Sequence, residues 1–194
     1  MPNLYLFRSA IGADKKDTGE HTMERAKLAK AIKDAAYLEG DFILSSGQRS
    51  KYYLDKYLFS TDPTLLKEIA KAFAAILPAD YDVLAGLELG AVPLVTAVAL
   101  EVGKPYVLVR KAAKEYGTSK LFEGRLEAGQ RIVLIEDVLT TASQAIDAGK
   151  RLRAFGADVV KVIYVIDREQ GAAKNLKNAG FVAQALFTKT DLGI

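Results

Sequence analysis

The feature of this sequence that most restricts its fold is the alternation of short apolar segments with segments of helical periodicity. Apolar runs suited to buried strands occupy residues 81–86, 105–111, 131–137, 158–167 and 181–187. Apolar residues spaced as on one helix face occupy residues 92–103, 143–156 and 169–180. Strands that alternate with helices predict an α/β fold, in which helices flank a central and mostly parallel sheet.

The N-terminal part of the chain predicts a helix, an arm and a second helix. An amphipathic pattern from Met23 to Gly40 predicts a helix that ends at the glycine. Residues 41–55 place two apolar patches around a Ser-Ser-Gly turn, which predicts a hairpin or an extended arm. Residues 61–77 predict a helix with Asp62 as its N-cap and Pro63 at its first position.

The length of 194 residues fits one domain. We expect an N-terminal extension over residues 1–22 and a single domain over residues 23–194. Within that domain, residues 23–60 would form the first helix and a small arm that covers the site like a hood.

The composition limits the chemistry and the partners. The chain has no cysteine and one histidine, which excludes thiolate metal sites, cysteine nucleophiles and histidine-rich sites. A net charge of +3 suits a small anionic substrate and gives little reason to expect a nucleic-acid partner. No apolar run has membrane-spanning length and the N-terminus does not resemble a signal peptide, so we expect a cytoplasmic protein without a membrane partner.

In a parallel sheet, ligands bind beyond the carboxyl ends of the strands, so the loops that follow the strands are the candidate sites. The loop "EDVLTTAS" places Glu136 and Asp137 before a hydroxyl-rich turn and a helix that starts near Ser143. Amide groups at a helix start, with nearby hydroxyls, can hold a phosphate, while carboxylates accept hydrogen bonds from ribose hydroxyls. The loop therefore suits a ribose 5-phosphate. Alternatively, its acids and threonines only cap the helix and the preceding turn.

Three other loops follow predicted strands. The glycines of residues 86–93 would let backbone amides approach a second phosphate, unless this is an ordinary turn. Residues 110–120 carry four cations in a long connection, which suits a lid over a polyphosphate or, alternatively, a solvated charged face. Arg168 suits a planar carboxylate or imide edge, although a lone arginine can also be an ordinary surface residue.

Taken together, these loops resemble those of type I phosphoribosyltransferases and, more narrowly, of orotate phosphoribosyltransferases. "VLIEDVLTTAS" matches the family motif for phosphoribosyl pyrophosphate (PRPP), and "RKAAKEYG" matches the catalytic lid pattern Arg-Lys-x-x-Lys-x-(His or Tyr)-Gly. "DREQG" resembles the orotate-side loop, and "FILSSGQRSKYYLD" resembles the arm that covers the base. The resemblance runs from about Met23 to the end of the chain. The first motif is widely shared, whereas the lid and the arm point to orotate.

The resemblance implies an activity, a cofactor and an assembly. The activity is transfer of ribose 5-phosphate from PRPP to orotate, which yields orotidine 5'-phosphate and pyrophosphate in pyrimidine biosynthesis. Mg²⁺ would arrive bound to PRPP rather than be held by protein ligands. A homodimer is implied, in which the lid of one subunit reaches into the site of the other.

The resemblance also implies roles for individual residues. The catalytic lid over the pyrophosphate would be formed by Arg110, Lys111, Lys114 and Tyr116. The pyrophosphate would also touch Leu89 and Gly90. The rest of PRPP would bind to Glu136 and Asp137 at the ribose hydroxyls, and to the loop Val138, Leu139, Thr140, Thr141, Ala142, Ser143 and Gln144 that leads to the 5-phosphate. Orotate would bind to Thr140, Arg168, Tyr53 and Leu54.

Three positions depart from the family pattern. Ser45 stands where the arm usually carries a substrate-contacting lysine, and Ala91 and Ala142 stand where the two phosphate loops often have glycine. The added methyl groups would weaken phosphate binding if either backbone position needs a positive φ.

Three alternatives remain at this stage. The substitution at Ser45 allows a phosphoribosyltransferase for another base, although the lid and "DREQG" argue against it. A regulator that senses PRPP without catalysis would keep the phosphate loop but usually lose the lid cations, which are present here. A generic α/β domain would require four matching loops to be coincidental.

Overall fold

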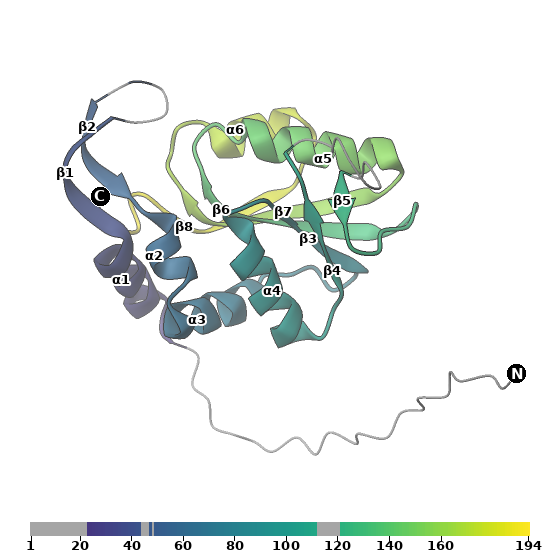
Figure 1. The fold of residues 1–194 in the computed structure, drawn as a ribbon, viewed down its shortest axis with the longest axis horizontal. Coiled ribbons are helices and arrows are strands. Elements are labelled where there is room, and N and C mark those ends of the chain that lie inside the picture. Colours follow the sequence, from purple (N-terminus) through teal and green to yellow (C-terminus); the bar gives the residue numbers. More distant parts are fainter. Residues whose placement is uncertain (1–22, 44–46, 48, 112–120) are drawn as a thin grey trace, which may run out of the picture.

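A computed structural model of the chain describes residues 23–43, 47, 49–111 and 121–194. A six-stranded sheet has the order β5-β4-β3-β6-β7-β8 (Figure 1). Its strands are β3 (Val83–Leu87), β4 (Tyr106–Val109), β5 (Phe122–Glu123), β6 (Arg131–Leu139), β7 (Asp158–Asp167) and β8 (Ala183–Thr188). All neighbouring strands are parallel except β4 and β5. The predicted α/β fold is thereby confirmed.

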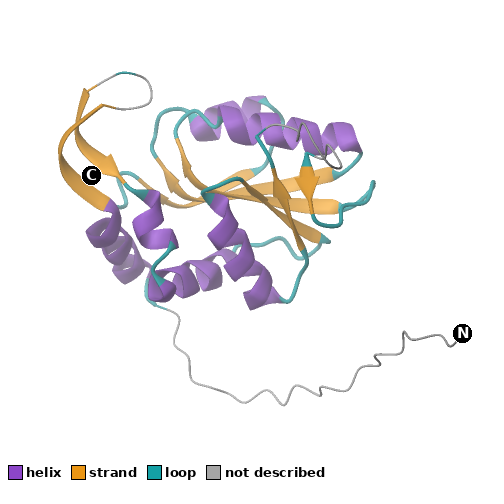
Figure 2. Ribbon diagram, in the orientation of Figure 1, coloured by secondary structure: helices purple, strands orange, loops and turns teal. Residues whose placement is uncertain are grey.

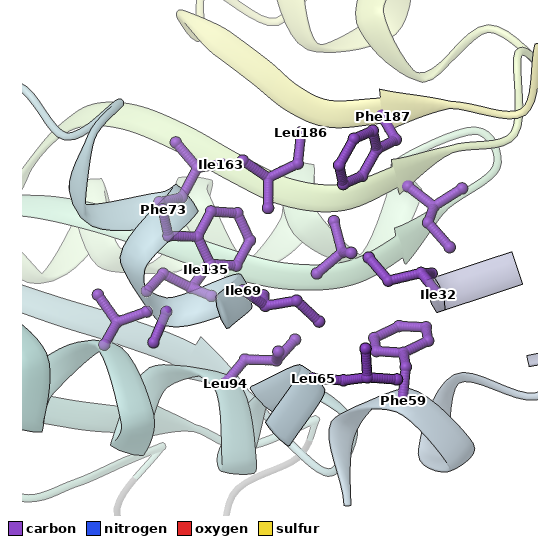
Figure 3. Packing of buried hydrophobic residues seen from close by; sticks show 14 of the residues in the cluster. Ile32, Phe59, Leu65, Ile69, Phe73, Leu94, Ile135, Ile163, Leu186 and Phe187 are labelled. Carbon is purple, nitrogen blue, oxygen red and sulfur yellow. The ribbon is translucent and has the colours of Figure 1, made fainter. Parts of the chain in front are cut away.

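Helices cover both faces of this sheet (Figure 2). One layer contains α1 (Arg25–Ala36), α2 (Lys56–Ser60), α3 (Pro63–Ala74) and α4 (Ala91–Val102). The other contains α5 (Ser143–Phe155) and α6 (Ala172–Asn178). Because successive side chains of a strand point to opposite faces, Ile132 and Leu134 pack on the α5 side, whereas Val133 and Ile135 pack on the other. The sheet thus has a hydrophobic core on each face, and Figure 3 shows the core between the sheet and the larger helical layer.

A separate antiparallel hairpin stands beside the sheet (Figure 1). It consists of β1 (Tyr37–Ile43) and β2 (Arg49–Leu54), whose register is interrupted between Glu39 and Phe42. The hairpin follows α1 and leads through β2 into α2, so its base is fixed to the larger helical layer. Its position agrees with the arm predicted for residues 41–55.

The first predicted helix is too long at its C-terminus. The structure ends α1 at Ala36 and places Gly40 inside β1. Tyr37 pairs with Leu54, and Leu38 pairs with Tyr53, so cross-strand pairing overrides the local helical pattern. The helix α2 and the strand β5 were not predicted, because segments of five and two residues are too short to show a period.

Other predicted boundaries are confirmed. α3 begins at Pro63, and the Asp62 side chain accepts a hydrogen bond from the amide of Leu65 at 2.8 Å. α5 begins at Ser143, directly after the hydroxyl-rich loop. No helix in the described ranges is both long and apolar enough to cross a membrane.

The two leucines of α4 provide a test of this packing. Leu94 is 0% exposed in the core, whereas Leu100 is 81% exposed. Leu94→Ala should lower the free energy of unfolding by about 2–5 kcal/mol, because it opens a cavity. Leu100→Ala, in the same helix, should change it by less than about 0.5 kcal/mol. Urea unfolding followed by circular dichroism measures both, and equal losses would contradict the assigned core.

Candidate functional site

A pocket of about 240 Å³ lies at the carboxyl ends of β3 and β6. It gathers many of the residues that the sequence singled out: Leu89, Gly90, Lys111, Glu136, Asp137, Val138, Leu139, Thr140, Ala142, Ser143 and Gln144. It also contains Lys56, Tyr57 and Glu88, which the sequence did not single out. β3 and β6 are parallel neighbours, so the loops that follow them meet at one edge of the sheet.

Two buried carboxylates form the floor of this pocket. The exposed fractions of Glu136 and Asp137 are 7% and 3%. Burial, followed by the negative charge of Asp137, raises the pKa of Glu136 to about 8, and the cations of Lys56 and Lys111 offset only part of this effect. Glu136 is therefore largely protonated at neutral pH, so it can donate as well as accept a hydrogen bond.

Asp137 is instead paired with a cation. Nζ of Lys56 lies 2.7 Å from Oδ2 of Asp137, whose side chain is 5% exposed. Burial alone would lower the pKa of Lys56, but the hydrogen bond and charge of Asp137 raise it above its usual value. The pocket thus carries one ion pair beside one carboxyl group that holds its proton.

The hydroxyl-rich loop opens directly onto the N-terminus of α5. Its Ala142 has φ 62° and ψ 18°, in the left-handed region, and no side chain in the described ranges caps the helix start. The free amide groups of the first turn and the helix dipole favour an anion here. Ala142, in the proposed 5-phosphate loop, therefore has the positive φ at which its methyl group would weaken phosphate binding. Ala91 lies in α4 and has no positive φ.

Gly90 ends the β3–α4 turn and contacts the ion pair. A Cβ atom added at Gly90 would lie 1.6 Å from Oδ2 of Asp137 and 2.7 Å from Nζ of Lys56. Its φ is −66°, so the backbone conformation does not favour glycine here, and a side chain would instead displace the groups of the ion pair. Neighbouring Leu89 is 65% exposed and lines the pocket.

The first two predicted lid residues are held from two sides. Glu88 accepts a hydrogen bond from the amide of Lys111 at 2.9 Å and lies 3.9 Å from Nη1 of Arg110. Arg151 of α5 donates to the carbonyl oxygens of Arg110 and Lys111, at 2.9 and 3.0 Å. The other two predicted lid residues, Lys114 and Tyr116, lie outside the described residues.

The hairpin meets the sheet edge through Tyr52. Nη2 of Arg168 donates to the Tyr52 hydroxyl at 3.2 Å, and Nζ of Lys189 lies 5.6 Å from the ring centroid. Burial raises the pKa of Tyr52, but Arg168 and Lys189 outweigh burial and lower it overall. Of the predicted arm residues, Tyr53 is 41% exposed and Leu54 is 5% exposed in the core.

Comparison with known proteins relates this geometry to a family. Residues 60–189 match the phosphoribosyl transferase domain. An orotate phosphoribosyltransferase from Natronomonas pharaonis is 48% identical over 171 residues, or 88% of this chain and 98% of that protein. The chain belongs to the orotate phosphoribosyltransferase family.

Solved structures agree with this assignment. The orotate phosphoribosyltransferase of Mycobacterium tuberculosis in complex with Fe(III) dicitrate has a TM-score of 0.77 at 34% identity, over 88% of this chain and 99% of that chain. The same enzyme in complex with PRPP has a TM-score of 0.74 at 31% identity, over the same fractions. Membership in the phosphoribosyltransferase family excludes the alternative that the four loops match by coincidence.

Several residues in or near the pocket of this family member were not found from its sequence. Lys56 and Tyr57 lie in α2, which is too short to predict, and Glu88 was part of a loop considered only for its glycines. Tyr52 could have been found from the two-residue period of a strand, because Leu54 enters the core and Tyr52 shares its side. No sequence signal pointed to Lys189.

The protonated carboxyl group predicts a pH dependence of stability. Glu136 has a raised pKa of about 8 in place of 4.5, so the folded protein binds one more proton than the unfolded chain between these pH values. The free energy of unfolding should therefore fall as pH rises through this window, by up to about 1.4 kcal/mol per pH unit. Glu136→Gln should flatten this slope. Urea unfolding at pH 5.5, 7 and 8 measures it, with the exposed Glu101→Gln as control. Equal slopes in all three proteins would contradict the buried proton.

Proposed function

We propose that this chain transfers ribose 5-phosphate from PRPP to orotate, and so forms orotidine 5'-phosphate and pyrophosphate in pyrimidine biosynthesis. The observation that carries the proposal is the junction of a buried carboxylate pair with an uncapped helix start at the carboxyl edge of a parallel sheet. One pocket thereby offers a site for a sugar beside a site for its phosphate. The names of the relatives support orotate as the acceptor.

In this proposal, PRPP lies across the pocket with its ribose over β6. Glu136 and Asp137 bind the ribose hydroxyls, and the loop from Val138 to Gln144 carries the 5-phosphate to the start of α5. The amide and hydroxyl groups of residues 140–144 then hold the phosphate. The loop is tied to α6, since Asn175 donates to the carbonyl oxygen of Thr141 at 3.0 Å.

The pyrophosphate of PRPP lies at the other end of the pocket. The backbone at Leu89 and Gly90 contacts it, and Arg110, Lys111, Lys114 and Tyr116 close over it. No three acidic or histidine side chains in the described ranges converge as metal ligands. A Mg²⁺ ion here would therefore take most of its oxygen ligands from the pyrophosphate and from water, and when bound it would stabilise the charge of the leaving group.

The chemistry requires a held sugar rather than a strong base. A ring nitrogen of orotate, which gives up its proton to water, attacks the anomeric carbon of the ribose, and the bond from that carbon to the pyrophosphate oxygen breaks. Positive charge develops on the sugar ring, as in glycoside chemistry. The lid cations stabilise the negative charge that develops on the leaving group, and the pocket holds the reactants in line.

We place orotate between the hairpin and the carboxyl edge of β7. Thr140 and Arg168 bind its polar edge, and Tyr53 and Leu54 belong to the arm that covers it. Arg168 already contacts the arm through Tyr52, and Lys189 lies beside the same ring. We propose that Lys189 supplies the second cation that Ser45 cannot supply from the arm.

Two features of the proposal concern the molecule as a whole. We propose a homodimer, in which the lid of one subunit reaches the site of its partner. Light scattering of the purified protein measures its mass, and mixing two differently inactivated variants tests whether subunits share sites. The cytoplasmic location and the lack of nucleic-acid or membrane partners remain predictions from the sequence.

The activity itself is tested by the loss of orotate absorbance with PRPP and Mg²⁺ present. Loss that depends on both additions is expected, and Lys114→Ala should reduce the rate roughly 10²–10³-fold, because the proposal assigns its charge to stabilising the leaving group. Lys150→Ala, at an exposed position of α5, serves as control. Binding of PRPP without turnover would favour a regulator, and turnover with another base would favour a different acceptor.

The proposed role of Lys189 gives a separate test. Lys189→Met keeps the aliphatic stem and removes the charge, so it should raise the KM for orotate roughly tenfold, as for a lost contact between charged groups. The KM for PRPP should change little. Lys174→Met, at an exposed position of α6, is the matched control. A normal KM for orotate in Lys189→Met would remove this residue from the base site.

A further inference from the structure

One lysine reaches the pocket from outside the four predicted loops and outside the residues matched to the domain family. Lys56 is the first residue of α2, which follows the hairpin. The helix start is fixed in place, because Asp55 accepts a hydrogen bond from the amide of Tyr57 at 3.0 Å and donates its own amide to the carbonyl oxygen of Ala36 at 2.9 Å. The ammonium group of Lys56 is therefore delivered to the pocket by a rigid segment.

The contact between Lys56 and Asp137 joins two unequally exposed groups. The Asp137 side chain is 5% exposed and that of Lys56 is 36% exposed, with 2.7 Å between Nζ and Oδ2. A carboxylate this deeply buried requires a partner to stay ionised. Lys56 also lines the pocket, and its side chain is more exposed than that of its partner.

The turn after β3 is shaped around this ion pair. A side chain at Gly90 would collide with Oδ2 of Asp137 and approach Nζ of Lys56. The proposed pyrophosphate turn, the proposed ribose carboxylate and the ammonium of Lys56 are thus in direct contact. The other charged groups of this pocket are Glu88, Lys111 and Glu136, so Lys56 and Lys111 are its two cations among the described residues.

We propose that Lys56 is a positioning residue of this reaction, which holds the Asp137 carboxylate in place for the ribose hydroxyls at the junction with the pyrophosphate turn. This inference rests on the proposed function, since it assigns a role within the same site. The inference is consistent with glycine at position 90, where a Cβ atom would meet both groups of the ion pair.

Lys56→Met removes the ammonium and keeps most of the aliphatic stem. We expect the KM for PRPP to rise roughly tenfold to hundredfold, as for a lost hydrogen bond between charged groups, with a smaller change in the KM for orotate. Lys56→Arg should recover part of this loss, because it restores a charged donor. The exposed Lys174→Met of α6 should behave like the unaltered protein.

A double-mutant cycle separates positioning from a general structural role. If Lys56 acts through Asp137, then Lys56→Met should change the KM for PRPP less than threefold in an Asp137→Asn background. A purely structural role would lower the melting temperature and give equal losses in both backgrounds. Should Lys56→Met fail to fold, Lys56→Gln, which keeps a neutral donor, carries the same measurement.

Two results would overturn the inference: an unchanged KM for PRPP in Lys56→Met, or equal losses in the two backgrounds. Calorimetric binding of Mg²⁺–PRPP keeps this test independent of turnover. If the unaltered protein binds PRPP but does not convert orotate, the proposed function fails, while the affinity of Lys56→Met for PRPP still decides the role of Lys56.

Discussion

The central strand of the sheet ends in buried negative charge, and the site is organised around that charge. β6 is hydrogen-bonded to β3 on one side and to β7 on the other, with helices on both faces. Glu136 and Asp137 are therefore largely buried, which raises the pKa of Glu136 and favours the pairing of Asp137 with the ammonium of Lys56. Lys56 and Gly90, from two other segments, complete this arrangement.

Local sequence pattern was enough to predict most of the sheet and its helices. The apolar runs of β3, β6 and β7 and the cap of α3 depend on neighbouring residues alone, so periodicity and the Asp62–Pro63 pair identified them. The boundary between α1 and β1 depends instead on the pairing of Tyr37 with Leu54, which no local pattern contains. Elements as short as α2 and β5 carry no period at all.

The site, like the fold, has parts that local sequence predicts and parts that depend on contacts between distant segments. Its loops could be placed because parallel strands bring their carboxyl ends to one edge, whatever the side chains are. Lys56 and Lys189 could not be found, because their roles arise when segments distant in sequence meet. Ala142 shows a further limit, since the sequence raised the question of its φ and only the backbone answered it.

The helix α5 connects two ends of the proposed site. Its first turn faces the proposed 5-phosphate. Arg151, eight residues after Ser143, donates hydrogen bonds to the backbone carbonyl oxygens of Arg110 and Lys111, where the proposed lid begins. At about 1.5 Å per residue, these points are roughly 12 Å apart along one rigid rod. One rigid helix therefore links the proposed phosphate end of the site to the backbone at which the proposed lid begins.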